Sequence, residues 1–251
     1  MMQSSSELRK KARDILPGSY SMFVLAMGAS FFLTTILNRF LVLFPALPGF
    51  ALAYTEDTVL SFFSTLLLTM LRTGLLFMAL NVARRGRASL SDLFLAFRYD
   101  PGRAAALCAV LALIETVVTF PMDYVVYSWV ARGFIALPGL SAISGPGAIA
   151  AAFAVSLLIS LFLAVVISFP FSQAVFLYID HQEYSAMQCL AESRNLMRGH
   201  ILEYTRLHLD FIGYFALCVI SFGLGLLWVL PYLNVTRSGY YMQLTGNYHP
   251  Y

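Results

Sequence analysis

Long apolar runs constrain this chain more strongly than any other feature. They cover residues 20–38, 58–83, 104–128 and 148–179. Each matches or exceeds the roughly 18 residues that a helix needs to cross the hydrocarbon core of a bilayer. Pro170 lies within the last run and is expected to kink it. Charged residues make up 12% of the chain, about half of their usual share in soluble domains. The sequence therefore predicts an all-α, polytopic membrane protein.

A fifth apolar block, residues 205–244, is about twice as long as one span. It is interrupted by Phe222-Gly223-Leu224-Gly225, where two glycines favour a tight turn. We therefore expect a hairpin of two helices, 205–222 and 226–243, and six transmembrane helices in total. The alternative is a single tilted span, which would leave five.

Arginine and lysine residues gather on one side of the expected spans. Four precede the first span, five lie between the second and third, and three lie between the fourth and fifth, whereas the opposite side has Arg39 and Arg132. Cytoplasmic loops carry the excess of positive charge in membrane proteins. We therefore expect a cytoplasmic N-terminus and, with six spans, a cytoplasmic C-terminus. The first apolar run has no early cleavage pattern and is expected to be a retained anchor.

A short polar segment precedes the first, third and fifth runs, and the three segments share a pattern. Each begins with Ser-x-x-Glu, Asp or Gln, which caps the start of a helix, and reaches a glycine thirteen or fourteen residues after its first serine. The serines are Ser4, Ser89 and Ser185, and the glycines are Gly18, Gly102 and Gly199. We therefore expect three internal repeats, 4–85, 89–182 and 185–251, each an interfacial helix plus a helical hairpin.

Each segment also places apolar residues on one face of the expected helix. The three stripes are Leu8, Ala12, Ile15 and Leu16; Leu90, Leu93, Phe94 and Phe97; and Ala186, Cys189, Leu190 and Met197. Short helices with an apolar stripe and a basic polar face lie in the headgroup plane of a membrane. Within 185–198, we expect Leu190 and Met197 to face lipid or protein, and Glu192 and Arg198 to face water.

Two charged residues lie inside the expected spans, Arg72 in the second and Glu115 in the third. Each is eleven residues from the cytoplasmic end of its run, which is about 16 Å by helix rise. An antiparallel helix pair would therefore bring them to the same depth. The two residues form either a structural ion pair that joins the helices or a site for a substrate or proton. Their matched depth favours the structural pair.

The expected sixth span contains Asn234, Thr236 and Arg237 after Pro231. A transmembrane helix with polar residues and a proline in its middle usually faces protein rather than lipid. These three residues are therefore a candidate polar surface, which either packs against other helices or lines a cavity.

The sequence lacks the common motifs of catalysis. It has no Gly-x-Ser-x-Gly elbow, no His-Glu-x-x-His and no phosphate-binding glycine loop. Its four histidines have no helical metal-ligand spacing, and it has no concentrated basic face for nucleic acid. We therefore expect a non-enzymatic protein with no catalytic residues, metal site or cofactor.

The chain resembles one family of bacterial membrane proteins over almost its whole length. ELRKKARDILPGSY at 7–20 resembles the opening of that family, SDLFLAF at 91–97 its middle loop, and ESRNLMRGH at 192–200 the start of its closing signature. The most specific part is Gly-x-Gly-x-x-Trp-x-x-Pro-Tyr at 223–232, followed by Tyr240-Tyr241. The family is grouped as domain of unknown function 975. The resemblance implies a polytopic protein of the bacterial cytoplasmic membrane and no established reaction.

Two functions fit these features. The first is a scaffold or accessory subunit, whose basic amphipathic helices bind anionic lipids of the inner leaflet and organise other membrane proteins. The second is a small transporter or lipid-handling protein that uses Arg72, Glu115 and the polar sixth span as a path. A packed interior with an exposed inner-leaflet groove would favour the scaffold, and a continuous polar cavity at mid-depth would favour transport.

Overall fold

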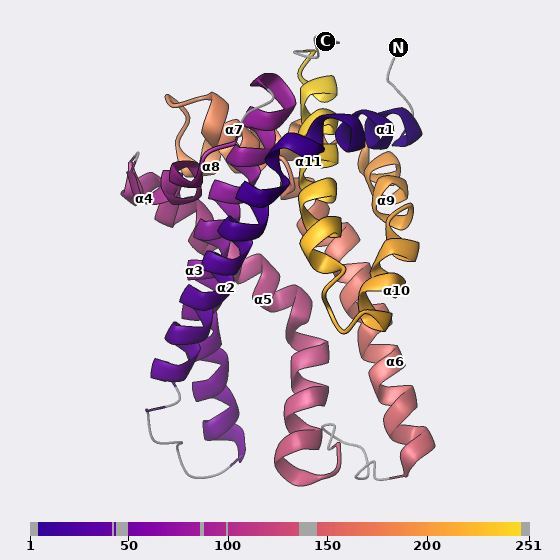
Figure 1. The fold of residues 1–251 in the computed structure, drawn as a ribbon. Coiled ribbons are helices and arrows are strands. Elements are labelled where there is room, and N and C mark those ends of the chain that lie inside the picture. Colours follow the sequence, from indigo (N-terminus) through magenta and orange to yellow (C-terminus); the bar gives the residue numbers. More distant parts are fainter. Residues whose placement is uncertain are drawn as a thin grey trace.

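The computed structural model describes residues 5–41, 43, 50–85, 88–98, 100–135 and 145–246, and these are almost entirely helical (Figure 1). The all-helical class predicted from the sequence is therefore confirmed for this part of the chain. Four continuous helical stretches are long and apolar enough to cross a membrane: Ser6–Phe40, Leu52–Arg84, Pro101–Arg132 and Pro146–Asp180. They coincide with the first four apolar runs.

The first two long helices form an antiparallel hairpin. α1 (Ser5–Ile15) leads through the 3₁₀ turn η1 (Leu16–Ser19) into α2 (Tyr20–Leu41), and α3 (Phe50–Arg85) returns beside it. α3 has 36 residues, which is about 54 Å by helix rise, against about 30 Å for the hydrocarbon core of a bilayer. It is therefore much longer than one crossing requires.

The second hairpin pairs a regular helix with an interrupted one. η2 (Leu90–Phe94) and α4 (Leu95–Arg98) precede α5 (Pro101–Arg132). The returning arm consists of α6 (Pro146–Leu163), the π-helix η3 (Ala164–Ser168), the 3₁₀ turn η4 (Phe169–Phe171) and α7 (Ala174–Asp180). The interruption coincides with the kink predicted at Pro170, which has no N–H group to donate to the helix.

The third unit is shorter and more broken. It consists of α8 (Ala186–Leu196), α9 (Ile201–Leu209), α10 (Ile212–Ile220) and α11 (Leu226–Leu244). α10 and α11 are in contact and meet at a turn where Phe222 and Gly223 have positive φ. The break predicted at 222–225 is therefore confirmed.

The α10–α11 hairpin does not extend as far as the other two. Figure 1 shows its turn well short of the far ends of α3, α5 and α6. None of α9, α10 and α11 is among the four membrane-length stretches. A turn at Asp210 and Phe211 divides the first arm, and α11 carries polar residues in its middle.

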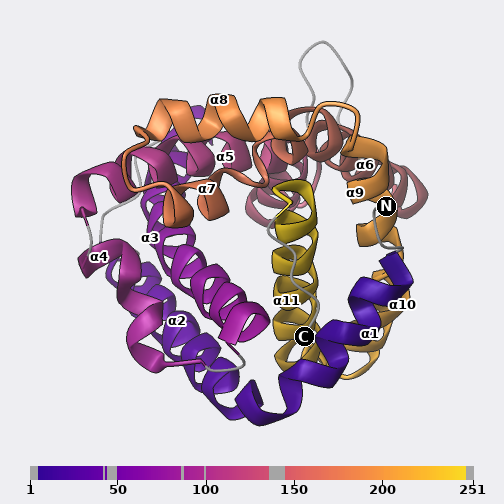
Figure 2. The same cartoon turned by 90° about the horizontal axis from the view of Figure 1, so that it is seen from above.

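The short helix before each hairpin lies at the same end of the molecule. Figure 1 shows α1, α4 and α8 at the end where α11 finishes, which we call the terminal end. The opposite end, where α2 ends and α6 begins, is the distal end. Seen along the molecule, α1, α4 and α8 are arranged around α11 (Figure 2).

Two of the three predicted helix caps are present. Ser89 with Asp92, and Ser185 with Gln188, form reciprocal capping boxes at the starts of η2 and α8. The third, at Ser4, lies outside the described residues. The chain therefore begins both of these segments with the local hydrogen bonds that its sequence predicts.

The apolar stripes of α1 and α8 pack against protein. Leu8, Ala12 and Leu16 are at most 3% exposed. The division of faces predicted for residues 185–198 is confirmed. Leu190 and Met197 on the apolar side are buried, whereas Glu192 and Arg198 on the polar side are exposed.

The four residues of the stripe predicted for 90–97 are not buried alike. Leu93 is buried, whereas Leu90, Phe94 and Phe97 are 40%, 41% and 40% exposed. Residues 90–94 form a 3₁₀ helix, which continues as α4. The backbone of Leu93 fits over Gly74 of α3, where a Cβ atom would lie 2.0 Å from the Leu93 carbonyl oxygen.

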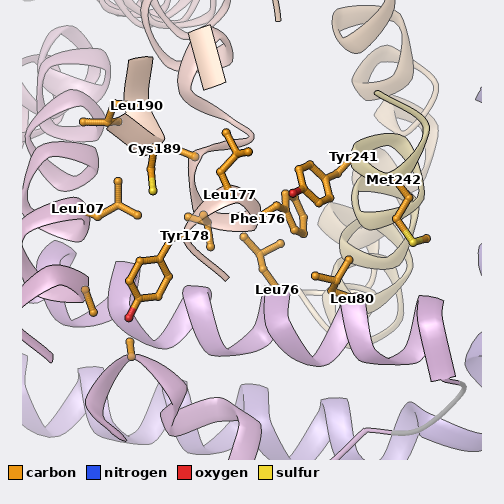
Figure 3. Close-up of a cluster of buried hydrophobic side chains, with 14 of the residues drawn as sticks. Leu76, Leu80, Leu107, Phe176, Leu177, Tyr178, Cys189, Leu190, Tyr241 and Met242 are labelled. Atoms are coloured by element: carbon orange, nitrogen blue, oxygen red, sulfur yellow. The ribbon is translucent and has the colours of Figure 1, made fainter. Parts of the chain in front are cut away.

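The buried core lies in the terminal half of the molecule. One cluster joins α3, α5, α7, α8 and α11 (Figure 3) and includes the rings of Phe176 and Tyr241, which stack with their centroids 5.0 Å apart. A second cluster joins α1, α2, α3 and α11, and a third joins α1, α9, α10 and α11. Because α11 contributes to all three, it is the element that connects the core.

Candidate functional site

Arg72 on α3 and Glu115 on α5 form an ion pair. Arg72 Nη1 lies 2.7 Å from Glu115 Oε1 and 2.9 Å from Oε2. The two side chains remain 50% and 36% exposed, so neither is enclosed by the packed core. The structure therefore brings together the two charged residues that the sequence places at matched depth.

From this pair towards the distal end, α3 and α5 enclose a cleft of about 450 Å³. The α3 wall consists of Tyr54, Asp57, Thr58, Ser61 and Thr65. These residues recur every three or four positions and so share one helix face. The α5 wall consists of Glu115, Thr116, Thr119, Phe120, Asp123, Val126, Tyr127 and Val130. The cleft is therefore a groove of mixed polar and apolar lining that leads to the ion pair.

The hydroxyl groups of the cleft present acceptors to its interior. Thr58 donates to the Tyr54 carbonyl at 2.8 Å, and Ser61 donates to the Thr58 carbonyl at 2.9 Å. Thr116 donates in the same way to the Ala112 carbonyl at 2.9 Å. Each hydroxyl has a single hydrogen, so donation to the helix backbone leaves the oxygen lone pairs for a ligand. The walls are therefore rich in hydrogen-bond acceptors.

Three carboxylates line the same cleft, those of Asp57, Glu115 and Asp123. Glu115 and Asp123 are eight residues apart, or about 12 Å along α5, so the negative charges are spread along the groove. In the part of the chain that the structure describes, no three His, Cys, Asp or Glu side chains are grouped as metal ligands. A groove lined by one sign of charge attracts solutes of the opposite sign.

Aromatic rings border the distal part of the cleft. The ring centroid of Tyr54 lies 5.2 Å from that of Tyr127, 5.3 Å from that of Tyr124 and 6.0 Å from that of Phe120. Tyr54, Phe120 and Tyr127 also line the cleft, as does Asp57. Aromatic faces attract organic cations, and a nearby carboxylate strengthens that preference.

The length of α3 limits where the cleft would lie if α3 crosses a membrane. Thr65 is nineteen residues before Arg84, which is about 29 Å and close to the full thickness of the hydrocarbon core. With Arg84 at one membrane surface, the wall from Tyr54 to Thr65 stands at the other surface or outside it. Arg72, twelve residues from Arg84, then lies about 18 Å deep. With this placement, the cleft would open to water at its distal end and close within the membrane at Arg72.

The polar residues of the expected sixth span do not line this cleft. Asn234 and Arg237 are half-buried on α11, and the buried Thr236 donates its hydroxyl to the Tyr232 carbonyl at 2.8 Å. α11 packs against α1, α2 and α3 in the terminal half, whereas the cleft lies in the distal half. The structure therefore does not join these residues to Arg72 and Glu115 in one path.

A network of charged and polar side chains closes the terminal end. Arg84 of α3 donates two hydrogen bonds to Asp180 of α7, at 2.8 and 2.6 Å, and Tyr241 Oη of α11 donates to the same carboxylate at 2.9 Å. Arg103 of α5 donates to carbonyl oxygens at the end of α7, including that of Tyr178 at 2.9 Å. Arg84 and Arg103 are two of the five arginines between the second and third expected spans, and the sequence used them only to predict the orientation of the chain in a membrane. Their partners are far away in the chain and were not predicted.

Sequence reasoning also missed the cleft, although part of its signal is visible. Asp57, Thr58, Ser61 and Thr65 recur at helical spacing at the start of an otherwise apolar run, which marks one polar face. A search for polar stripes would find this wall. The opposite wall, on α5, could not be predicted in this way, because its position depends on how the two hairpins pack.

Comparison with family models agrees with the resemblance seen in the sequence. The model of the family described as "Protein of unknown function (DUF975)" matches residues 1–248. Comparisons with curated proteins and with solved structures found no match. Since the family model covers nearly the whole chain, the chain belongs to this family of proteins of unknown function, DUF975.

Proposed function

We propose that this non-enzymatic membrane protein binds a small organic cation in the cleft between α3 and α5 and transports it. The lining of the cleft supports this most directly, since acceptor hydroxyls, three carboxylates and aromatic rings share two facing helix surfaces. Its volume of about 450 Å³ falls within the range of roughly 300–1,000 Å³ that is usual for small-molecule sites.

In this proposal the ion pair at the end of the cleft couples binding to helix movement. A cation enters past Asp57 and Asp123 and reaches Glu115, whose carboxylate is held by Arg72. The cation then competes with the guanidinium for the same oxygens. Release of Arg72 removes a contact between α3 and α5 at this depth, which allows the two helices to separate there.

Binding of radiolabelled tetraethylammonium to the protein in lipid nanodiscs tests the proposal. We expect saturable binding that Asp57→Asn weakens about tenfold, because a carboxylate close to a bound cation contributes about 1–2 kcal/mol in a protein surface environment. Uptake of the same cation into vesicles then distinguishes transport from binding alone.

Glu56→Gln is the matched control for this experiment. Glu56 precedes Asp57 on α3 but does not line the cleft, so its replacement should change the affinity less than about twofold. The absence of saturable binding, or an equal loss of affinity in both variants, would contradict the proposal.

We also propose six crossings of a bacterial cytoplasmic membrane, with both termini on the cytoplasmic side. The arrangement of charge supports this orientation, because α1, α4 and α8 carry basic residues and lie at the terminal end (Figure 1). Arg39 and Arg132 lie instead near the distal ends of α2 and α5. The shorter third hairpin, with α9 and α10 as one arm and α11 as the other, would supply the fifth and sixth crossings.

Single cysteines in a cysteine-free variant test this topology. A cysteine at Thr58 should react with a membrane-impermeant maleimide added outside the cell, whereas cysteines at Ser89, Ser185 and Gly246 should not. Labelling of Gly246 from outside would leave five crossings instead of six.

A second candidate function, the organisation of partners at the inner leaflet, is favoured by exposed apolar side chains at the terminal end. Met187 on α8 is 68% exposed, and Leu90, Phe94 and Phe97 are at least 40% exposed. A photo-crosslinker at Met187 in native membranes tests this candidate, with Glu192 on the polar face as the control position. One recurrent protein adduct at Met187 would support it, and lipid adducts alone at both positions would contradict it.

A further inference from the structure

The segment formed by η2 and α4 is apolar on two sides. Leu93 and Ala96 are at most 1% exposed, and Leu93 belongs to the buried cluster that joins α1, α2, α3 and α11. Three other side chains of the segment are at least 40% exposed: Leu90, Phe94 and Phe97. Figure 2 shows α4 at the outer edge of the molecule. The segment therefore packs with one side on the bundle and presents a second apolar surface outward.

Contacts with α3 fix the position of this segment along the bundle. The backbone of Leu93 lies so close over Gly74 that no Cβ atom would fit between them. Gly74 is ten residues before Arg84, which is about 15 Å by helix rise. After it leaves α3, the chain therefore turns back along the side of that helix.

The neighbouring helix α2 gives an independent measure of depth. It has 22 residues, about 33 Å by helix rise, and so matches the roughly 30 Å of the hydrocarbon core. Ser64 of α3 donates a hydrogen bond to Asn38 of α2, which sets the register of these antiparallel helices. Tyr20, where α2 begins, is eighteen residues from Asn38, and Gly74 is ten from Ser64. Gly74 and Leu93 therefore lie eight residues, about 12 Å, inside the terminal end of α2.

The start of the segment satisfies its polar groups within the protein. The Asp92 carboxylate accepts a hydrogen bond from the Ser89 amide at 3.3 Å and another from Asn81 Nδ2 of α3 at 3.0 Å. The Asp92 amide donates to the Ser89 carbonyl at 3.1 Å. Asn81 is seven residues, about 10 Å, closer to the terminal end than Gly74, so this carboxylate is directed towards the membrane surface. Irregular chain is tolerated at membrane depth only where protein satisfies its backbone in this way.

The surroundings of the outward surface favour lipid as its neighbour. η2 contacts α2, and Met22 and Leu25 near the start of α2 are 38% and 57% exposed. Apolar side chains on the outside of a membrane-length helix contact acyl chains. Arg98, which follows Phe97 and is exposed, adds a positive charge of the kind that anionic headgroups attract.

We propose that η2 and α4 form a re-entrant segment, which inserts Leu90, Phe94 and Phe97 among the acyl chains of the leaflet at the terminal end. It reaches deeper than the headgroup plane expected from the sequence, because Leu93 packs so far along α3. The proposal depends on α2 and α3 crossing a membrane and not on cation binding in the cleft. It restricts the second candidate function to the α8 side of the terminal end, where Met187 is exposed.

Spin labels on single cysteines test the proposal in nanodiscs of phosphatidylcholine and phosphatidylglycerol. Labels at Phe94 and Phe97 should collide more with oxygen, which concentrates among acyl chains, than with a water-soluble nickel chelate. The ratio of the two should place them roughly 10 Å below the membrane surface, as the register with α2 requires. Leu25 on α2 is the reference for lipid, and Glu192 on the exposed polar face of α8 is the reference for water.

Two results would overturn the proposal. A label at Phe94 that meets the nickel chelate as readily as one at Glu192 would place the segment in water. Low accessibility to both reagents would show that a protein surface covers it, either a second copy or another partner. The label at Leu25 tests the crossing separately, so a lipid signal there with a water signal at Phe94 refutes the re-entrant segment alone.

A tryptophan variant keeps the test informative if the spin labels disturb the segment. Phe94→Trp retains an aromatic side chain and is made together with Trp129→Phe and Trp228→Phe, which remove the other tryptophans. Lipids brominated on their acyl chains should reduce its emission, and acrylamide in the water should not. Quenching by acrylamide without quenching by the brominated lipids would refute the insertion.

Discussion

The terminal and distal halves of this protein differ in what lies between their helices. In the terminal half, three clusters of buried apolar side chains surround α11, and the bonds of Arg84 with Asp180 link the ends of α3 and α7. In the distal half, α3 and α5 face each other with hydroxyls and carboxylates across a cleft. The first half is therefore built for stability, and the second leaves polar groups available to a ligand.

α3 belongs to both halves and shows how one helix serves two purposes. Between Leu71 and Ala83 it contributes buried residues to two clusters. Between Tyr54 and Thr65 it forms a wall of the cleft. Its length of 36 residues separates the two roles along one helix. Substitutions along this helix should thus affect stability at one end and binding at the other.

The largest loss of stability is expected for Asp180→Asn. Asp180 accepts hydrogen bonds from Arg84 and Tyr241 and is 15% exposed, so its neutralisation removes the negative charge opposite the partly buried Arg84 guanidinium. We expect a decrease of about 3 kcal/mol in the free energy of unfolding, measured by thermal or denaturant unfolding in detergent. Asp100→Asn is the control, because Asp100 is 65% exposed and asparagine tolerates its left-handed backbone. Equal effects in both would show that the terminal network does not stabilise the protein.

A smaller loss is expected for Gly74→Ala. The new Cβ would lie 2.0 Å from the carbonyl oxygen of Leu93, a backbone atom that cannot rotate away. Such overpacking costs about 1–3 kcal/mol. Gly28→Ala in α2 has no atom within 4 Å of the new methyl group and should leave stability unchanged or raise it by up to about 1 kcal/mol. If both variants unfold alike, η2 does not pack against α3 as described.

The Arg72–Glu115 pair lies between the two halves and should have an intermediate effect. Arg72→Met or Glu115→Gln alone should lower the free energy of unfolding by about 1–2 kcal/mol, less than for a fully buried pair because both side chains are partly exposed. The double variant should recover much of that loss, since non-additivity indicates direct contact. If the single variants are stable, and the change in the free energy of unfolding of the double variant equals the sum of theirs, the pair has no structural role. Arg72 and Glu115 would then be candidates for a functional site.

The smallest effect on stability is expected in the cleft itself. Asp57→Asn should change the free energy of unfolding by less than about 0.5 kcal/mol, because the side chain is exposed in the groove and packs against no core residue. Its effect should be visible only in cation binding. A destabilisation comparable to that of Asp180→Asn would show that the distal half also stabilises the fold.

Local features of the structure were predictable where they depend on neighbours in the chain. The capping boxes at Ser89 and Ser185, the turn at Gly223 and the kink at Pro170 all follow from side chains or backbone properties within a few residues. What local pattern did not predict is that Leu93 of the 90–97 stripe is buried over Gly74, a residue of another helix.

By itself, the sequence determined the helical class, the apolar runs and the matched depth of Arg72 and Glu115, because composition and helix rise require no knowledge of how the helices pack. Only the tertiary structure decided that α3 and α5 face each other with polar residues, that Asp180 links Arg84 to Tyr241, and that Arg237 does not line the cleft. Each of these joins residues distant in the chain. Their contacts depend on which hairpins pack together and at what rotation, which hydrophobic periodicity alone does not specify.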